Sequence, residues 1–229
     1  MLAGLRVCLL ILHDPTRAYA ELGRRGGWGA PFLLCTAVMG ATAILTFPYV
    51  KHILLLSFPP DASQTHVDAV LRGASRTMIL APMWAGITLA LRWVLEAGVV
   101  FLVVIAISGW MSFKKAMTLI AYSFIPICLG IILTVFVLWL KGFDNINEAG
   151  DLLVAYGPNL FLEDPAGIKG ALAKSVDLFA VWRLLLLGMG LQAMAKLRVS
   201  GAFVVVLVFW SVETCMAICG VLLKQSLLS

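Results

Sequence analysis

Long apolar runs separated by shorter polar segments dominate the pattern of this chain. Five runs are mostly apolar over about 20 residues, the length at which an α-helix crosses about 30 Å of hydrocarbon at 1.5 Å per residue. They cover residues 30–49, 83–108, 116–140, 178–195 and 202–223. The pattern therefore predicts an all-α fold, a polytopic bundle of five transmembrane helices that forms one domain over residues 1–229.

Residues 1–28 precede the first span and carry shorter amphipathic patterns. Within 2–12, apolar side chains recur at the period of a helix that lies in the membrane interface: Leu2, Leu5, Cys8 or Leu9, and Leu12. Asp14 then predicts the N-cap of a second helix that has Pro15 in its first position. Gly23 is expected to end that helix.

The segments between the spans are expected to be loops. The first outer loop, residues 50–82, contains a short amphipathic stretch at 67–78, and Pro82 suits the entry to the second span because its missing N–H costs nothing there. The second outer loop, residues 141–177, is acidic and is interrupted by Gly-Pro-Asn and Asp-Pro turns.

Composition supports insertion in a membrane. The chain is 62% hydrophobic and 13% charged, whereas soluble domains are about 45–50% apolar and about 25% charged. The net charge of +5 raises the question of nucleic acid, but many of the basic residues cluster at the ends of the apolar runs, where topology signals and lipid contacts are found. We therefore expect the lipid bilayer, and no nucleic acid, as a partner.

The distribution of basic residues predicts the orientation of the chain. The side with the N-terminus carries eight of them: Arg6, Arg17, Arg24, Arg25, Lys114, Lys115, Lys196 and Arg198. The opposite side carries seven: Lys51, Arg72, Arg76, Lys141, Lys169, Lys174 and Lys224. Because Lys114–Lys115 and Lys196/Arg198 lie in very short loops, where the positive-inside rule is most reliable, the N-terminus is predicted to be cytoplasmic and the C-terminus to lie opposite. In a bacterium this membrane would be the inner one.

The sequence offers no chemistry for catalysis. It contains no HExxH, GxSxG or Walker motif. Its five cysteines are odd in number, and Cys215 and Cys219, four residues apart, have no histidine near them in the chain, so packing is favoured over a metal site. We expect no catalytic residue, no metal and no cofactor, and therefore no enzyme.

Four charged residues fall inside the predicted spans: Arg92, Glu96, Arg183 and Glu213. Charges at such depth face protein or water and need partners. One interpretation is a polar pathway or proton-linked switch, and the other, which we favour, is a structural ionic cluster that fixes helix packing. Pro126 is a candidate helix kink in the third span, and a fixed bend is favoured there over a gate.

Three stretches carry a resemblance to a known family: HDPTRAYAELGRRGGWGAPF, GWMSFKKAMTLIAYSFIP and VDLFAVWRLLLLGMGLQAMAKLRVS. Together they resemble the Yip (Ypt-interacting protein) domain family in its prokaryotic form. The resemblance implies a non-enzymatic integral membrane protein. Eukaryotic relatives are trafficking adaptors, and some prokaryotic ones accompany ABC-type export systems. The eukaryotic signature of aspartate, leucine, tyrosine, glycine and proline is absent, so Rab-type GTPase binding is not carried over.

Two functions follow as hypotheses. The first is a scaffold or accessory subunit that contacts another integral membrane protein, such as an ABC-type transporter, with a homo-oligomer left open. The second is a small transporter or channel that uses Arg92, Glu96, Arg183 and Glu213 as its polar pathway. The two differ in whether these charges line a water-accessible cavity or are sealed against one another.

Overall fold

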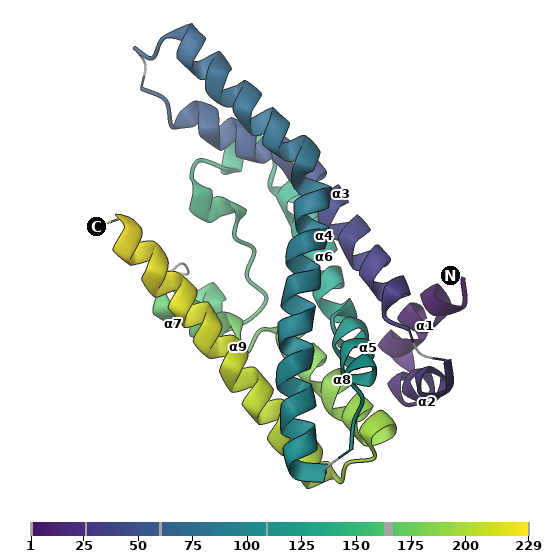
Figure 1. The fold of residues 1–229 in the computed structure, drawn as a ribbon. Coiled ribbons are helices and arrows are strands. Elements are labelled where there is room, and N and C mark those ends of the chain that lie inside the picture. The colour runs from purple at the N-terminus through teal and green to yellow at the C-terminus, as the bar shows by residue number, and fades with distance from the viewer. Residues whose placement is uncertain (1, 26, 60, 109, 163–166, 229) are drawn as a thin grey trace. The chain divides into compact units, whose positions relative to one another are not determined.

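The computed structural model describes residues 2–25, 27–59, 61–108, 110–162 and 167–228. Within these ranges every regular element is a helix (Figure 1). Five helical segments are long and apolar enough to cross a membrane: Gly29–Leu56, Gln64–Ile107, Phe113–Lys141, Leu178–Ala195 and Val199–Leu223. The predicted all-α fold with five transmembrane helices is confirmed.

The elements follow one another along the chain with short connections. The α-helices are α1 (Leu2–His13), α2 (Pro15–Arg25), α3 (Gly29–Leu56), α4 (Gln64–Ser108), α5 (Phe113–Ser123), α6 (Ile125–Lys141), α7 (Ile168–Lys174), α8 (Leu178–Ala195) and α9 (Val199–Leu228). Three 3₁₀ turns lie between α6 and α7: η1 (Phe143–Asn145), η2 (Ala149–Leu152) and η3 (Pro158–Phe161).

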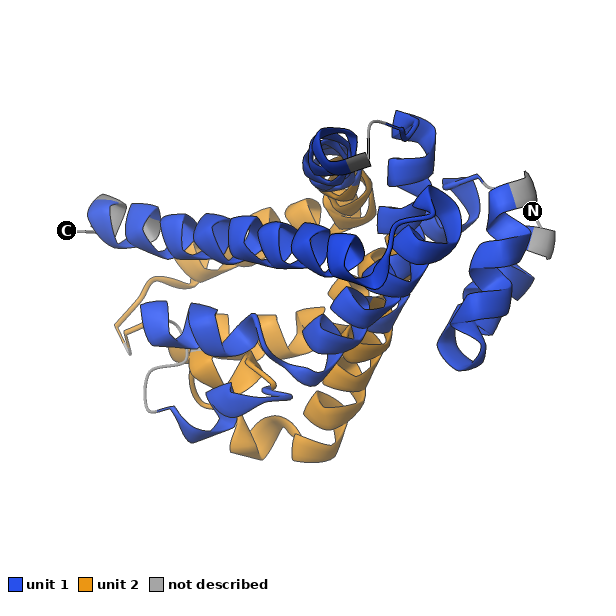
Figure 2. Ribbon diagram, turned by 90° about the horizontal axis from the view of Figure 1, so that it is seen from below, with its two compact units in different colours: residues 1–34, 90–127, 155–229 blue, residues 35–89, 128–154 orange. Residues whose placement is uncertain are grey.

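The chain divides into two compact units (Figure 2). Unit 1 contains Met1–Leu34, Ala90–Ile127 and Ala155–Ser229, and unit 2 contains Cys35–Leu89 and Cys128–Val154. Helices α3, α4 and α6 therefore contribute residues to both units. The prediction of a single domain stays a prediction.

The N-terminal helices of unit 1 begin as the sequence predicts. The Asp14 carboxylate accepts a hydrogen bond from the Arg17 backbone N–H at 3.1 Å, and α2 starts at Pro15. Helix α2 runs past Gly23 to Arg25, so the predicted end at Gly23 is wrong. The two residues that follow Gly23 are arginines, which are good helix formers, and a glycine inside a helix costs only about 1 kcal/mol.

Helix α8 lies at the centre of unit 1 and packs against α2, α5 and α9. A side chain at Gly190 would put its Cβ 2.5 Å from Cδ2 of Leu119 and 2.7 Å from Cζ of Tyr19. The absence of a side chain therefore lets α2 and α5 approach the α8 backbone, as small residues do in membrane helix packing. Asp177 caps α8 because its Oδ1 accepts from the Ala180 N–H at 2.7 Å.

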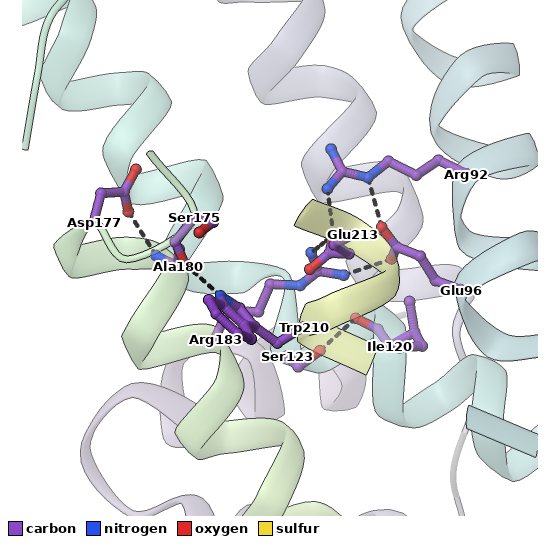
Figure 3. Close-up of polar contacts among 10 residues, drawn as sticks. All are labelled: Arg92, Glu96, Ile120, Ser123, Ser175, Asp177, Ala180, Arg183, Trp210 and Glu213. Carbon is purple, nitrogen blue, oxygen red and sulfur yellow. Dashed lines mark hydrogen bonds and ion pairs between the residues drawn. The ribbon is translucent and has the colours of Figure 1, made fainter. Parts of the chain in front are cut away.

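Helix α9 is tied to the start of α8 by a side-chain hydrogen bond. The indole Nε1 of Trp210 donates to the backbone carbonyl of Ser175 at 3.0 Å, in the turn that joins α7 to α8. Figure 3 shows this bond beside the Asp177 cap. Both contacts hold the N-terminal end of α8, from which Arg183 is positioned.

Unit 2 contains a helical hairpin where the sequence predicts a loop. Helix α3 continues to Leu56, and α4 begins at Gln64 after the Ser63 Oγ accepts from the His66 N–H at 3.3 Å. Within the predicted loop over residues 50–82, residues 57–59 and 61–63 are outside the helices as expected, whereas residues 50–56 and 64–82 are helical, so the prediction is wrong for those two ranges.

Pro82 lies inside α4 and not at its start, which corrects the prediction for that residue. Pro82 faces Gly40 of α3, where an added Cβ would lie 2.9 Å from the Cβ of Pro82. A proline inside a helix removes one backbone hydrogen bond, and the missing side chain of Gly40 leaves room for the Pro82 ring against α3.

The third span is divided into two helices. Helix α5 ends at Ser123 and α6 begins at Ile125, so Pro126 is the second residue of α6. At the junction the Phe124 N–H donates to the Ile120 carbonyl at 3.1 Å, and the Ile127 N–H donates to the Phe124 carbonyl at 3.0 Å. This junction places the Phe124 side chain in the interior of unit 1.

In the rest of unit 2, the first part of the acidic loop packs onto α3 and α6. Tyr49, Leu138 and Ile146 form its buried apolar cluster, and the Lys141 ammonium donates to the Asp151 carbonyl oxygen at 3.1 Å. In the predicted acidic loop, Pro158 begins η3, as expected for the Gly-Pro-Asn turn. The Asp164-Pro165 turn and Glu163 lie outside the described residues, as do the side chains of Arg24, Arg25 and Lys224.

Candidate functional site: an intramembrane ring of charges

The four charged residues predicted within the spans come together in unit 1 (Figure 3). Arg92 and Glu96 lie one turn apart on α4, while Arg183 comes from α8 and Glu213 from α9. The sequence separations are 30 residues between Arg183 and Glu213 and 87 between Glu96 and Arg183. Arg92 and Glu96 are therefore neighbours within α4, and tertiary packing brings Arg183 and Glu213 to them.

The two arginines and two glutamates alternate in a closed ring. Arg92 Nε donates to Glu96 Oε1 at 2.6 Å, and Arg92 Nη2 donates to Glu213 Oε1 at 2.7 Å. Arg183 Nη2 donates to Glu96 Oε2 at 2.5 Å, and its Nη1 donates to Glu213 Oε1 at 2.6 Å. Each carboxylate thus bridges both guanidiniums, and the formal charges of the ring sum to zero.

The ring has a sealed side and an open side. The Glu96 and Arg183 side chains are 1% and 3% exposed, whereas Glu213 is 20% and Arg92 51% exposed. Buried charges are tolerated only when they are paired and hydrogen-bonded. The buried charges of Glu96 and Arg183 therefore depend on their partners in the ring, while the Arg92 side chain stays half-exposed.

Two phenylalanines complete the site, and the sequence did not single them out. The guanidinium carbon of Arg92 lies 5.4 Å from the Phe124 ring centroid and that of Arg183 lies 5.2 Å from it. Arg183 also lies 5.1 Å from the Phe209 ring centroid. These distances are those of cation–π contacts. A phenylalanine in an apolar run gives no signal of this role, although Phe124 stands two residues before Pro126.

The ring leaves few groups available for chemistry. Both carboxylates are engaged by guanidiniums, so neither is arranged as a free general base. Arg183 Nε and Thr214 Oγ1 are buried without a hydrogen-bond partner in the described part of the chain. Cys215 and Cys219 lie exposed on α9. Among the described residues, no three His, Cys, Asp or Glu side chains lie together to hold a metal ion.

The sequence model of the Yip1 domain matches residues 9–221, a range that includes the four charges of the ring and nearly all of the five spans. The chain belongs to the Yip1 domain family. The resemblance to the Yip domain family is thereby confirmed, and the assignment to its prokaryotic form stays a prediction. No curated protein and no solved structure is significantly similar to it. This Yip1 domain is an integral membrane protein with several apolar helices.

Proposed function

We propose that this Yip1 domain is a non-enzymatic membrane scaffold or accessory subunit that acts through protein–protein contacts within the membrane. The observation that carries the proposal is the closed ring of Arg92, Glu96, Arg183 and Glu213. A pathway for ions or solutes needs polar side chains that face water, whereas two members of this ring are sealed and all four are paired. The ring therefore joins α4, α8 and α9 as a structural lock.

The energetic cost of the ring supports a packing role. A charge at the centre of a membrane helix costs about 2.5–3.5 kcal/mol on insertion scales. Four ion pairs and three cation–π contacts offset this cost only in one arrangement of the three helices. We infer in addition that Pro126 maintains a fixed bend that keeps Phe124 against the two guanidiniums.

A stripe on α4 is the proposed contact surface within the membrane. Leu91, Leu95 and Leu102 are exposed, and a side chain added at Gly98 would meet no atom within 4 Å. These four positions follow helical spacing, and small residues in such a stripe let a second helix approach closely. The partner we propose is another integral membrane protein, with an ABC-type exporter as the class that the prokaryotic resemblance favours.

The orientation is part of the proposal. We infer a cytoplasmic N-terminus in an inner membrane, with the acidic loop outside. Four tryptophans near the predicted span ends, Trp28, Trp84, Trp110 and Trp139, are exposed. Exposed tryptophans at these positions support the span boundaries, because indole rings favour the headgroup level.

One feature favours a second candidate, a small transporter or channel. The half-exposed Arg92 and the partly exposed Glu213 give the ring an open side. A pathway through the ring would require those groups to exchange partners during transport. This second candidate is therefore tested together with the scaffold.

The decisive experiment compares Glu213→Gln with Glu21→Gln. Glu21 pairs with Arg17 at 3.7 Å on an exposed face of α2, so its loss should have little effect. If the ring holds the three helices together, Glu213→Gln should lower the folded yield and the thermal stability of the protein. Wild-type proteoliposomes should then show no ion flux above empty vesicles. Unchanged stability in Glu213→Gln, combined with a wild-type flux that this variant abolishes, would establish the pathway instead.

The partner is tested by photo-crosslinking in native membranes. A photoreactive residue at Leu95 should give a stoichiometric adduct with another membrane protein, identified by mass spectrometry. The same residue at Leu185, which is exposed on α8, serves as the control. Adducts in equal yield from both positions, or adducts with a second copy of the chain alone, would contradict the proposed surface and partner.

A further inference from the structure

A hollow in unit 1 lies apart from the ring of charges. Its volume is about 310 Å³, at the lower end of the roughly 300–1,000 Å³ typical of small-molecule pockets. The residues that line it are Trp28, Phe32, Ala90, Trp93, Val94, Phe113, Lys114 and Met117. They come from the starts of α3 and α5 and from the middle of α4. None of the four ring residues lines it.

Aromatic side chains form most of the wall and hold one another in place. The Phe32 ring lies edge-on to Trp28, with centroids 5.7 Å apart, and edge-on to Trp93, with centroids 5.8 Å apart. Such edge-to-face pairs are favourable beyond the area they bury. The hollow is therefore preformed, and an occupant needs an apolar body.

One charged group gives the hollow a chemical preference. Lys114 is exposed in the first turn of α5, where the third span begins, and no ion pair of Lys114 occurs within the described residues. Because Lys114 lines the hollow together with the aromatic side chains, the hollow offers a cation next to an apolar wall.

We propose that this hollow binds a phospholipid with an anionic headgroup. One acyl chain enters between the aromatic rings, and the headgroup phosphate pairs with Lys114. A soluble anion lacks the apolar body that the walls require. A zwitterionic lipid lacks the net negative charge that an unpaired lysine near the membrane surface attracts. The inference is independent of the proposed scaffold function.

Native mass spectrometry of the full chain in detergent tests the site. The probes are phosphatidylglycerol and phosphatidylcholine with identical acyl chains, and the expected result is one retained phosphatidylglycerol in preference to phosphatidylcholine. Lys114→Gln should weaken phosphatidylglycerol binding about fivefold and remove the preference. Lys115→Gln is the matched control, because Lys115 is exposed next to Lys114 without lining the hollow, and it should leave both unchanged.

A second pair of variants tests the acyl chain. Ala90→Leu fills the hollow and should weaken binding of both lipids, whereas Ala106→Leu, at an exposed position on the same helix, should not. Circular dichroism and gel filtration establish that each variant is folded. Equal losses in Lys114→Gln and Lys115→Gln, full binding in Ala90→Leu, or displacement of phosphatidylglycerol by inorganic phosphate at equal concentration would each overturn the proposal.

Discussion

The two glutamates of the ring bind the same guanidiniums but differ in how much of each side chain is exposed. Glu96 is sealed and Glu213 is partly exposed. Breaking a buried ion pair by removing one partner costs about 3–5 kcal/mol, because the other charge stays buried and unpaired. We expect Glu96→Gln to lower the free energy of unfolding by about this amount, and Glu213→Gln by less, since Arg92 can turn outward.

Thermal unfolding in one detergent measures both variants. Removing Arg183 together with Glu96, as Arg183→Met with Glu96→Gln, should cost less than the sum of the two single changes, because neither residue then leaves an unpaired partner charge behind. Equal losses for the two glutamates, or strict additivity for the buried pair, would show that the ring does not act as one network.

Two glycines of α8 provide a second comparison between single residues. A methyl group at Gly190 would meet Leu119 and Tyr19 at 2.5 and 2.7 Å, whereas a methyl group at Gly188 would lie 3.6 Å from Val206. Gly190→Ala should therefore destabilise the protein by about 1–3 kcal/mol through overpacking. Gly188→Ala should be neutral or stabilising, because alanine favours a helix by up to about 1 kcal/mol over glycine. Melting temperatures of the two variants decide between these outcomes, and a more stable Gly190→Ala would contradict the close packing of α2, α5 and α8.

At the scale of elements, turn η2 of the acidic loop is held by one carboxylate. The backbone N–H groups of Asn147 and Glu148 donate to Asp151 Oδ2 at 2.9 and 3.2 Å, and these bonds, with Lys141 beside them, hold the pKa of Asp151 below its usual value. A depressed pKa in the folded state means that the contribution is complete above about pH 4, the ordinary pKa of aspartate, and is lost as the pH falls through the folded value.

We therefore expect the Asn147 and Glu148 amides to be protected from hydrogen exchange at neutral pH and to lose that protection below about pH 4. Asp151→Asn should remove the protection at neutral pH as well. Asp144→Asn is the control, since Asp144 is exposed in the preceding turn. Protection that survives in Asp151→Asn would assign the order of the turn to its apolar contacts.

The elements also show how far sequence patterns reach. The apolar runs predicted five spans because mostly apolar runs of that length are rare in helices that face water, and Asp14 predicted a helix start because a cap is a local interaction. The long hairpin of α3 and α4 was missed, since the packing of Pro82 against Gly40 is not local. At 1.5 Å per residue, the 45 residues of α4 reach about 67 Å, roughly twice the hydrocarbon thickness.

For the candidate site the same distinction holds. The four charges could be identified individually, because charge in an apolar run is rare. That they form a cluster across α4, α8 and α9 was only an interpretation of the sequence, and the individual pairs come from the structure. Phe124 and Phe209 carried no signal, since the apolar runs contain many aromatic residues with packing roles. The local pattern thus identifies residues that are unusual in a membrane but not ordinary residues that support them.

At the scale of the whole molecule, the proposed orientation in the membrane rests on two short basic segments. Lys114 and Lys115 begin α5, and Lys196 and Arg198 lie in the connection between α8 and α9. Because basic residues in short loops are retained in the cytoplasm, both segments should lie on the same side as the N-terminus. The acidic loop that contains Asp144 should lie on the other side.

Labelling with a membrane-impermeant maleimide in intact cells tests this orientation. In a background with all five cysteines changed to alanine, Asp144→Cys should react in intact cells, whereas Lys115→Cys should react only after permeabilisation. Both positions are exposed, so a difference in labelling reports sidedness and not burial. The reverse labelling pattern would show that the protein has the opposite orientation. The proposed lipid site, with Lys114 beside it, would then lie in the outer leaflet. Equal labelling of both positions in intact cells would mean that the basic segments do not set a single orientation.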